Sequence, residues 1–248
     1  MNQEIPLYED ERVDDLQFAE LHIIQSTKSF RFSMDSVLLA DFANVTPRCR
    51  MCDLGTGTGI IPLLLFGREP SIHCDAVEIQ QDAAERAQRS MRLNGADQQI
   101  TVHHGDLKEI RSLLPHAKYT LVTCNPPYAA AGAAIPSPKE AIQGARQEET
   151  CTFMDVAQAA NWLLQDHGRF CFMLPVSRLS EVIAVMKPLR MEVKRIRFVH
   201  STAQKEARLM LVEAMKGVSA GVRVLPPLVI KNADGTDTDE LKRIYHIK

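Results

Sequence analysis

Short apolar runs alternate with longer stretches of helical character through most of this 248-residue chain, and this alternation limits the possible folds more than any other feature. We expect strands at 51–54, 72–79, 100–104, 119–124, 169–174, 192–200 and 208–215. The helices expected between them run over 60–66, 81–93, 107–114, 152–165 and 177–189. Strands that alternate with helices form a mostly parallel sheet that is covered on both faces. The sequence therefore predicts an α/β fold with a doubly wound, mostly parallel sheet of seven strands.

The two ends of the chain depart from this alternation. No long helix separates the last two expected strands, so we predict a terminal antiparallel hairpin at one edge of the sheet. The main domain then covers 45–216. Before it, 1–44 forms an N-terminal arm, acidic and loosely ordered over 1–15, and a helix from Met34 to Phe42 that packs on the core, with Ser33 as its N-cap. After it, 217–248 forms an extension with a turn and a short helix at 237–245.

Charge and composition exclude several classes of protein. The net charge of −2 does not indicate a strongly basic nucleic-acid binder, so any such contact must come from local patches. The longest apolar runs, such as 60–66, are too short to cross a bilayer, and no signal peptide is evident, so we expect a cytoplasmic protein without membrane contact. Cys49 and Cys52 form a C-x-x-C without a second pair, and we expect no metal site.

A glycine-rich loop opens the first strand–helix–strand unit. It runs from Asp53 to Gly59 with glycines at alternate positions, which allow a sharp turn and close approach of a ligand. It matches neither the dinucleotide pattern G-x-G-x-x-G nor the phosphate-binding loop that ends in Gly-Lys-Ser/Thr. Glu78 ends the next strand, where a carboxylate can accept hydrogen bonds from a ribose diol. The alternative is an α/β fold with a glycine-rich turn and no nucleotide.

A second motif, Asn125-Pro126-Pro127-Tyr128, follows the strand at 119–124. Ligands of open α/β sheets bind outside the carboxyl ends of the strands. The Asn125 side-chain oxygen and the Pro126 carbonyl can both accept hydrogen bonds from one NH2 group, while the Tyr128 ring can stack on a planar group. The motif therefore suits a planar substrate with an exocyclic amine, although a proline turn with a packed tyrosine has the same residues.

In this order, Asp53 to Gly59, Glu78, Asp106 and the Asn-Pro-Pro-Tyr motif resemble the motif set of class I S-adenosylmethionine-dependent methyltransferases, which have a Rossmann-like fold. The stretch 30–42, FRFSMDSVLLADF, resembles the bacterial tRNA(Val) (adenine-37-N6)-methyltransferase family. Further similar stretches are 145–148, 211–214 and 226–230. The resemblance covers the chain from about Leu16 to its end, and Gln147 stands where that family leads us to expect histidine.

The resemblance implies a role for each motif residue. Gly55, Gly57 and Gly59 would line the methionine part of S-adenosylmethionine, and Asp53 would bind its ammonium group. Glu78 would hold the ribose hydroxyls, and Asp106 the adenine amine, unless Asp106 is only a helix N-cap. The implied catalytic and cofactor-binding residues beyond these are Asn125, Pro126, Pro127 and Tyr128.

The implied partner is tRNA, bound by a monomer through local basic residues. Lys194, Arg195 and Arg197 belong to a cluster with Lys187 and Arg190, for which an ordinary solvated edge is the alternative. Further expected contacts are Lys28, Arg31 and Arg146, the last in a long segment at 129–150 that suits a binding loop.

Three other functions fit the same motifs less closely. Enzymes that methylate a glutamine amide in a release factor share the Asn-Pro-Pro-Tyr motif, but they carry a helical N-terminal domain, and only about fifty residues precede the first strand here. A methyltransferase acting on guanine N2 in ribosomal RNA is disfavoured by the Phe-Arg-Phe stretch at 30–32. A protein that binds the cofactor and RNA without turnover would not need intact motifs.

Overall fold

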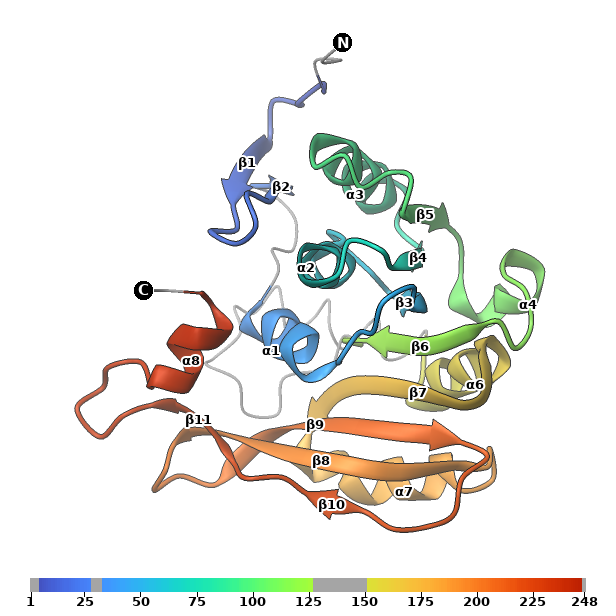
Figure 1. Ribbon diagram of the computed structural model, residues 1–248, viewed down its shortest axis with the longest axis vertical. Coiled ribbons are helices and arrows are strands. Elements are labelled where there is room, and N and C mark those ends of the chain that lie inside the picture. Colours follow the sequence, from blue (N-terminus) through green and yellow to red (C-terminus); the bar gives the residue numbers. More distant parts are fainter. Residues whose placement is uncertain (1–4, 28–32, 127–150, 247–248) are drawn as a thin grey trace.

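A large twisted sheet forms the centre of the molecule in the computed structural model, which describes residues 5–27, 33–126 and 151–246 (Figure 1). Its nine strands within these ranges are β3 (Arg50–Leu54), β4 (His73–Glu78), β5 (Ile100–His104), β6 (Tyr119–Cys124), β7 (Leu164–Pro175), β8 (Met191–Thr202), β9 (Ala207–Lys216), β10 (Arg223–Val224) and β11 (Leu228–Lys231). The order is β10-β8-β9-β7-β6-β3-β4-β5, and β11 also pairs with β8. The strands from β5 to β7 run parallel, which confirms the predicted α/β fold.

The C-terminal part of the chain adds strands that the sequence did not predict. β9 pairs antiparallel with both β7 and β8, so the predicted terminal hairpin is present. β10 and β11 then run along the far side of β8 in parallel orientation, so the sheet has two more strands than predicted and extends past residue 216. Leu228 and Ile230 alternate into the core with exposed fractions of 1% and 8%, which explains why this short segment joins the sheet.

Helices cover both faces of the sheet (Figure 1). On one face lie α1 (Met34–Phe42), α2 (Ile60–Arg68), α3 (Gln81–Leu93) and α8 (Asp239–Ile244). On the other lie α4 (Ile110–Leu113), α6 (Phe153–Leu163) and α7 (Leu179–Met186), with single turns of 3-10 helix at η1 (Leu107–Glu109) and η2 (Val176–Arg178). Each group packs on its own buried apolar cluster, as parallel strands with two covered faces require. The predicted helix at 152–165 ends at Leu163, because β7 begins at the next residue.

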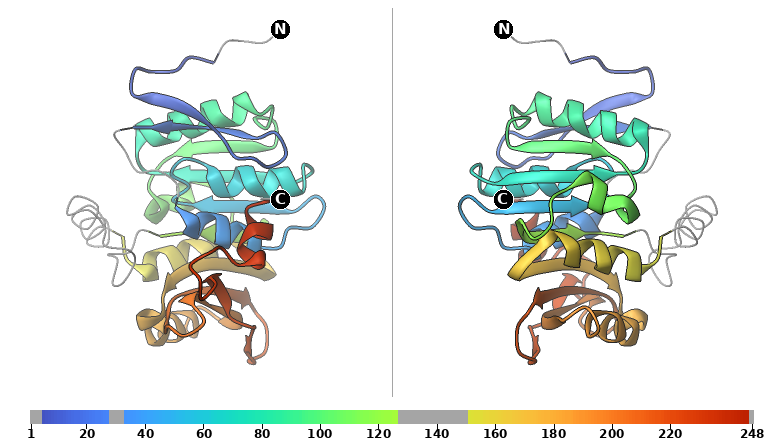
Figure 2. Two further views of the ribbon diagram at one scale, coloured as in Figure 1. Left: turned by 90° about the vertical axis from the view of Figure 1, so that its left-hand side faces the viewer. Right: turned by 90° about the vertical axis from the view of Figure 1, so that its right-hand side faces the viewer.

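The N-terminal arm is more ordered than predicted. β1 (Glu11–Asp15) and β2 (His22–Ser26) pair as an antiparallel hairpin that lies against α3, at the opposite end of the molecule from β8 and β9 (Figure 2). Ile23 and Ile24 of β2 are fully buried. The prediction of loose order for 1–15 is therefore wrong for Glu11–Asp15, because an acidic residue of this strand binds α3.

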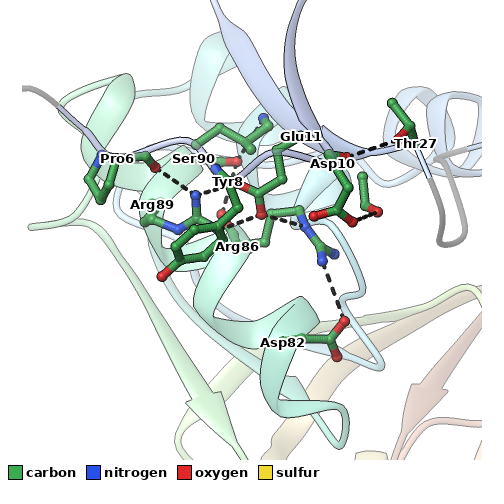
Figure 3. A network of polar contacts seen from close by, with 11 residues as sticks. Pro6, Tyr8, Asp10, Glu11, Thr27, Asp82, Arg86, Arg89 and Ser90 are labelled. Atoms are coloured by element: carbon green, nitrogen blue, oxygen red, sulfur yellow. Dashed lines mark hydrogen bonds and ion pairs between the residues drawn. The ribbon is translucent and has the colours of Figure 1, made fainter.

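That docking contact is a buried ion-pair cluster formed by Glu11, Arg86 and Arg89 (Figure 3). Arg89 donates from both terminal nitrogens to the Glu11 carboxylate at 2.6 Å, and Arg86 donates from Nε at 3.1 Å. The Tyr8 ring lies 4.5 Å from the Arg89 guanidinium carbon, and Arg89 also donates to the Pro6 carbonyl. The hydrogen bond from Arg89 is the main reason why the pKa of Glu11 falls to about 2.

Candidate active site

The predicted site residues converge because β3 lies between β4 and β6 in a parallel arrangement. Leu54, the last residue of β3, faces Val77 on one side and Cys124 on the other. The residues that follow these strand ends therefore meet at one edge of the sheet, which is where open α/β sheets bind their ligands. Glu78 and Asn125 are brought to this edge together with the glycine loop.

The glycine loop is held to Glu78 by its backbone. The Gly57 N–H donates to Oε2 of Glu78 at 2.8 Å, and the Gln80 N–H donates to Oε1 at 2.9 Å. The N–H groups of Gly55 and Thr56 both donate to the Val77 carbonyl. Glu78 is only 5% exposed, so this carboxylate shapes the loop as well as ending the strand. Each carboxylate oxygen retains a lone pair that can accept a ligand hydroxyl.

The three glycines serve different purposes. All of them have positive φ, at +67° for Gly55, +56° for Gly57 and +79° for Gly59. A Cβ on Gly55 or Gly57 would meet no atom of the described residues within 4 Å, so these two face open space. A Cβ on Gly59 would overlap Cε of Met91 and lie 3.3 Å from Cβ of Ala87. Gly59 therefore permits close packing of the loop on α3, and the open side at Gly55 and Gly57 is the one available to a ligand.

Asp53 is a buried carboxylate beneath this loop. It lies opposite Thr123 in the register of β3 and β6, and the Thr123 hydroxyl donates to Oδ1 at 2.5 Å. Burial raises the pKa of Asp53 to about 7, although the hydrogen bond from Thr123 favours the ionised form. A cationic group placed beside this carboxylate would favour its ionised form, as expected for a residue that binds an ammonium group.

Asp106 caps the first turn after β5. Its carboxylate accepts a hydrogen bond from the Lys108 N–H at 2.9 Å, and Lys108 Nζ lies 3.6 Å from the other oxygen. The capping role weighed from the sequence is thus observed. The Asp106 side chain keeps 31% of its surface exposed, so it can also accept a hydrogen bond from a ligand.

Asn125 and Pro126 follow β6 directly, whereas Pro127 and Tyr128 lie outside the described residues. The Asn125 amide donates from Nδ2 to the Ser36 hydroxyl of α1 at 3.1 Å. Its Oδ1 is buried and has no hydrogen-bond partner among the described residues. The donor end of the amide is therefore bound, and its acceptor end is left free.

A pocket is lined by both sequence neighbours of Asn125, Cys124 and Pro126. Gly55, Cys124 and Pro126 line it from the strand ends, and Leu107, Phe153 and Arg178 line it from the face of α6. Gly55 and Pro126 thus border one cavity, although they lie 71 positions apart in the sequence. Phe153 and Arg178 were not predicted as site residues. The sequence indicates them only by position, since Phe153 follows the expected loop at 129–150 and Arg178 follows the expected strand at 169–174.

Unpaired polar atoms gather at this edge. Buried side-chain oxygens without a partner among the described residues include Oδ2 of Asp53, Oγ1 of Thr56 and Oδ1 of Asn125. Buried polar atoms are normally hydrogen-bonded, so a cluster of unpaired ones indicates a site shaped for a polar ligand. Ile79, next to Glu78, adds an apolar side chain that is 59% exposed. Thr56 and Ile79 were also missed from the sequence.

The predicted RNA-binding residues that the structure describes lie on β8, and protein groups already bind them. Lys194 donates to the Ser219 carbonyl at 3.1 Å. Arg195 binds Glu213 with two hydrogen bonds, of 2.7 and 2.8 Å, and Arg197 binds both carboxylate oxygens of Glu240 at 2.8 Å. These contacts satisfy much of the hydrogen-bonding capacity of the two guanidinium groups within the fold. Lys28, Arg31 and Arg146 lie outside the described residues.

Cys49 and Cys52 point to opposite faces of the sheet, since each belongs to a different buried apolar cluster. Within the ranges that the structure describes, no group of three or more potential metal ligands occurs. None of the helices in those ranges is long and apolar enough to span a membrane.

Comparison with known proteins identifies the family. The family model of the methyltransferase small domain matches residues 31–173, which include the glycine loop, Glu78, Asp106 and the Asn-Pro-Pro-Tyr motif. The chain belongs to the methyltransferase small domain family. The sequence prediction of an S-adenosylmethionine-dependent methyltransferase is therefore confirmed.

Relatives of this methyltransferase carry the name tRNA1(Val) (adenine(37)-N6)-methyltransferase. One from Erwinia tasmaniensis is 31% identical over 69% of this chain and 69% of its own length. Another from Aliivibrio fischeri is 30% identical over 79% of this chain and 82% of its own. One from Aeromonas hydrophila is 27% identical over 90% and 91%. The family resemblance drawn from the sequence is thereby confirmed.

Solved structures agree on the fold. A structure described as a predicted O-methyltransferase from Agrobacterium tumefaciens superimposes with a TM-score of 0.71 at 23% identity, covering 86% of this chain and 96% of its own. TrmN from Thermus thermophilus gives a TM-score of 0.52 at 18% identity, covering 73% of this chain and 48% of its own. At these identities the likeness concerns the fold alone.

The site of this methyltransferase domain fits S-adenosylmethionine. The open side of the loop at Gly55 and Gly57 leaves room for the ligand backbone to approach. The unpaired oxygens of Asp53 and Thr56 suit the ammonium group of the methionine part, and Glu78 suits a ribose diol. These acceptor oxygens thus match the ammonium and the ribose hydroxyls of the cofactor.

Proposed function

We propose that this protein transfers a methyl group from S-adenosylmethionine to the exocyclic N6 of an adenine in RNA, namely adenine 37 of a tRNA(Val). The partner in this proposal is tRNA, which a monomer of this chain meets in the cytoplasm. Two considerations support the proposal: the names of relatives at 30% and 31% identity, and the chemistry of the residues after β6.

The observation that carries the proposal is the state of the Asn125 amide. Its Nδ2 end is bound by Ser36, and its Oδ1 end is buried and has no partner among the described residues. The residues before and after Asn125, Cys124 and Pro126, both line the pocket. An acceptor held in this way is complementary to an NH2 group. An adenine offers such a group at N6, on a flat ring.

Most of the catalysis would come from holding the target nitrogen in place with hydrogen-bond acceptors that point at it. The N6 lone pair is delocalised into the adenine ring, which makes the nitrogen a weak nucleophile. Hydrogen bonds from N6 to Asn125 Oδ1 and to the Pro126 carbonyl would favour a more tetrahedral nitrogen and hold it in line for attack. Proline fixes φ, so the Pro126 carbonyl is held by a stiff backbone. The nitrogen would gain a bond to the methyl carbon as the carbon–sulfur bond breaks and its electron pair stays on sulfur, which leaves a neutral thioether. The nitrogen would afterwards lose a proton to water.

S-adenosylmethionine, when bound, supplies a methyl group on a positively charged sulfonium, so the nitrogen needs no strong base before it attacks. We propose that Gly55, Gly57 and Asp53 hold the methionine part, with Gly59 supporting the loop through its packing on α3. Glu78 would bind the ribose hydroxyls. Asp106 would bind the adenine amine of the cofactor while it continues to cap η1.

The base itself would leave the anticodon loop to enter the pocket. An adenine in a loop is already free of a duplex partner, so its extrusion costs less than opening a base pair. Tyr128 is proposed to stack on it. Because Lys194, Arg195 and Arg197 are bound within the fold, we propose that they contact the tRNA only through donors left free by these internal bonds.

The test is methyl transfer to tRNA. Purified protein, labelled S-adenosylmethionine and unmodified total tRNA are incubated, and the digested tRNA is searched for N6-methyladenosine. Asn125→Ala is expected to lower kcat by about 100-fold, because it removes one aimed acceptor. Asn161→Ala is the matched control, since Asn161 also carries a buried unpaired amide oxygen but lies on α6.

Each alternative predicts a different distribution of label. Label in a protein fraction or as a methylguanine in ribosomal RNA, with none in tRNA, would refute the tRNA substrate and leave the methyltransferase assignment intact. Cofactor binding without transfer to any acceptor would indicate a binding protein. Equal rates for Asn125→Ala and wild type would refute the proposed role of the amide.

A further inference from the structure

The orientation of the Asn125 side chain decides whether it can act. A carboxamide has an acceptor oxygen and a donor NH2 of nearly the same shape, and a half-turn of the group exchanges them. Only the oxygen can accept a hydrogen bond from a target amine, since an NH2 group in its place would meet a second donor. A neighbouring group that binds one end and fixes the plane of the carboxamide therefore bears on how it can act.

Ser36 is the described residue that contacts this amide. Its Oγ accepts the hydrogen bond from Nδ2 of Asn125 at 3.1 Å, while Oδ1 has no partner within the described ranges. Ser36 is 6% exposed, so water does not readily replace this contact. The two residues lie 89 positions apart, on α1 and after β6, so the contact is set by tertiary packing.

The helix that carries Ser36 is held by guanidinium groups at its C-terminal end. Arg68 donates to the Ala40 carbonyl at 2.6 Å, and Arg195 donates to the Phe42 carbonyl at 3.3 Å. Cations are favourable at this end of a helix because they satisfy its unpaired carbonyls and oppose its dipole. Arg195 also lies over the Phe42 ring at 4.6 Å.

A further anchor comes from the C-terminal helix. α8 lies beside α1 in the views of Figure 1 and Figure 2, and Arg243 of α8 approaches the Asp41 carboxylate at 3.6 Å. Asp41 also pairs with Arg68 at 3.5 Å. Residues of α2, β8 and α8 thus bind the C-terminal end of α1, the helix that holds Ser36 against the Asn125 amide.

We propose that Ser36 is a positioning residue for methyl transfer: its hydroxyl binds the NH2 end of Asn125 and so fixes the plane of the carboxamide, which leaves the amide oxygen free for the target nitrogen. This inference rests on the proposed function of Asn125. Ser36 touches neither substrate nor cofactor in this role, and its effect passes entirely through the amide. Its removal therefore lowers kcat and leaves the KM for S-adenosylmethionine unchanged.

The experiment is a double-mutant cycle on the full chain. Ser36→Ala removes the acceptor and places a better helix former in α1, so the variant is expected to fold. Loss of one neutral hydrogen bond predicts a fall in kcat of about fivefold, with the KM for S-adenosylmethionine within about twofold. In the Asn125→Ala background the same change is expected to have no further effect on kcat, because the group through which Ser36 acts is gone.

Ser90→Ala is the matched control. Ser90 is a fully buried serine of α3, and its hydroxyl accepts from the Ile24 N–H at 3.0 Å and donates to the Arg86 carbonyl at 3.2 Å. Its loss is expected to lower the melting temperature without lowering kcat. A fall in kcat for Ser36→Ala without a matching fall in melting temperature then separates positioning from general destabilisation.

A second readout does not depend on activity. The side-chain NH2 signals of Asn125 in a 15N–1H NMR spectrum, assigned by their absence in Asn125→Ala, are expected to shift and to exchange faster with water in Ser36→Ala. Unchanged signals and unchanged kcat, with an active wild type, overturn this inference alone. A fivefold fall that persists in the Asn125→Ala background also overturns it. A wild type that transfers no methyl group to any acceptor overturns the proposed function together with this role.

Discussion

Replacing Glu11 by glutamine tests how the N-terminal hairpin is held on α3. Glu11 is the acidic member of the cluster with Arg86 and Arg89, and its side chain is 2% exposed (Figure 3). Glutamine has nearly the same shape but carries no charge and has only one acceptor oxygen. The change therefore leaves two buried guanidinium groups without their common counter-charge, while the packing of the hairpin is almost unaltered.

The expected loss follows from the pKa of Glu11. A shift from the usual 4.5 to about 2 corresponds to about 3 kcal/mol of stabilisation at neutral pH. Truncating one member of a buried ion pair typically costs about 3–5 kcal/mol, which agrees with this figure. Because the folded pKa is lowered, the stabilisation is complete above about pH 4.5 and is lost as the pH falls toward about 2.

Amide hydrogen exchange of the strands β1 and β2 is the direct assay. A loss of about 3 kcal/mol predicts that Glu11→Gln speeds exchange of the paired hairpin amides by about 100-fold at pH 7. Glu9→Gln is the matched control, since Glu9 is exposed two positions away and should change exchange by less than about twofold. Urea unfolding at pH 7 and near pH 2.5 should show the difference between variant and wild type shrinking in acid.

Two results would refute this reasoning. If Glu11→Gln and Glu9→Gln exchange alike at pH 7, the buried pair contributes no net stability, as can happen when desolvation cancels the attraction of the charges. If the difference between Glu11→Gln and wild type persists unchanged near pH 2.5, the effect belongs to packing rather than to the charge of Glu11.

Two further predictions concern the glycine loop and the strand before it. Because burial raises the pKa of Asp53 to about 7, the cofactor-free protein should lose stability as the pH rises from 5 to 8. Asp53→Asn, whose amide oxygen can still accept from Thr123, should remove about 3 kcal/mol of that loss in urea unfolding. Parallel pH profiles of unfolding free energy for wild type and variant would contradict this. Gly59→Ala should cost about 2 kcal/mol, from positive φ plus crowding of the new Cβ against Cβ of Ala87, since the flexible end of Met91 can move aside. Gly95→Ala, with positive φ and open space, should cost about 1 kcal/mol. Equal losses in thermal unfolding would exclude the crowding.

Local pattern was sufficient for the central elements. The apolar run at 119–124 and the helix at 81–93 have the predicted bounds, because each is an uninterrupted pattern between turn residues. The motif residues at the ends of β3, β4 and β6 could also be found in advance, since their position after an apolar run and their side-chain chemistry are visible in short stretches. The C-terminal strands were missed because β10 has two residues and β11 has four, too few for a pattern.

Residues that depend on partners far away in the chain could not be predicted. Arg195 and Arg197 form part of a basic cluster in the sequence, but their acidic partners Glu213 and Glu240 are 18 and 43 positions away. Glu11 belongs to an acidic arm in the sequence, and only the fold brings it to Arg89, 78 positions on. Sequence patterns record the charge of a residue but not the groups that surround it.

The sequence by itself determined the class of fold, the cofactor loop, the acidic end of β4 and the amide after β6. These depend on interactions within a few residues, where turn chemistry and strand periodicity apply. The tertiary structure decided which glycines face open space, which arginines are bound within the fold and which end of Asn125 is free to accept. Gly59 against Met91 and Ser36 against Asn125 are contacts between separate elements, and packing alone selects them.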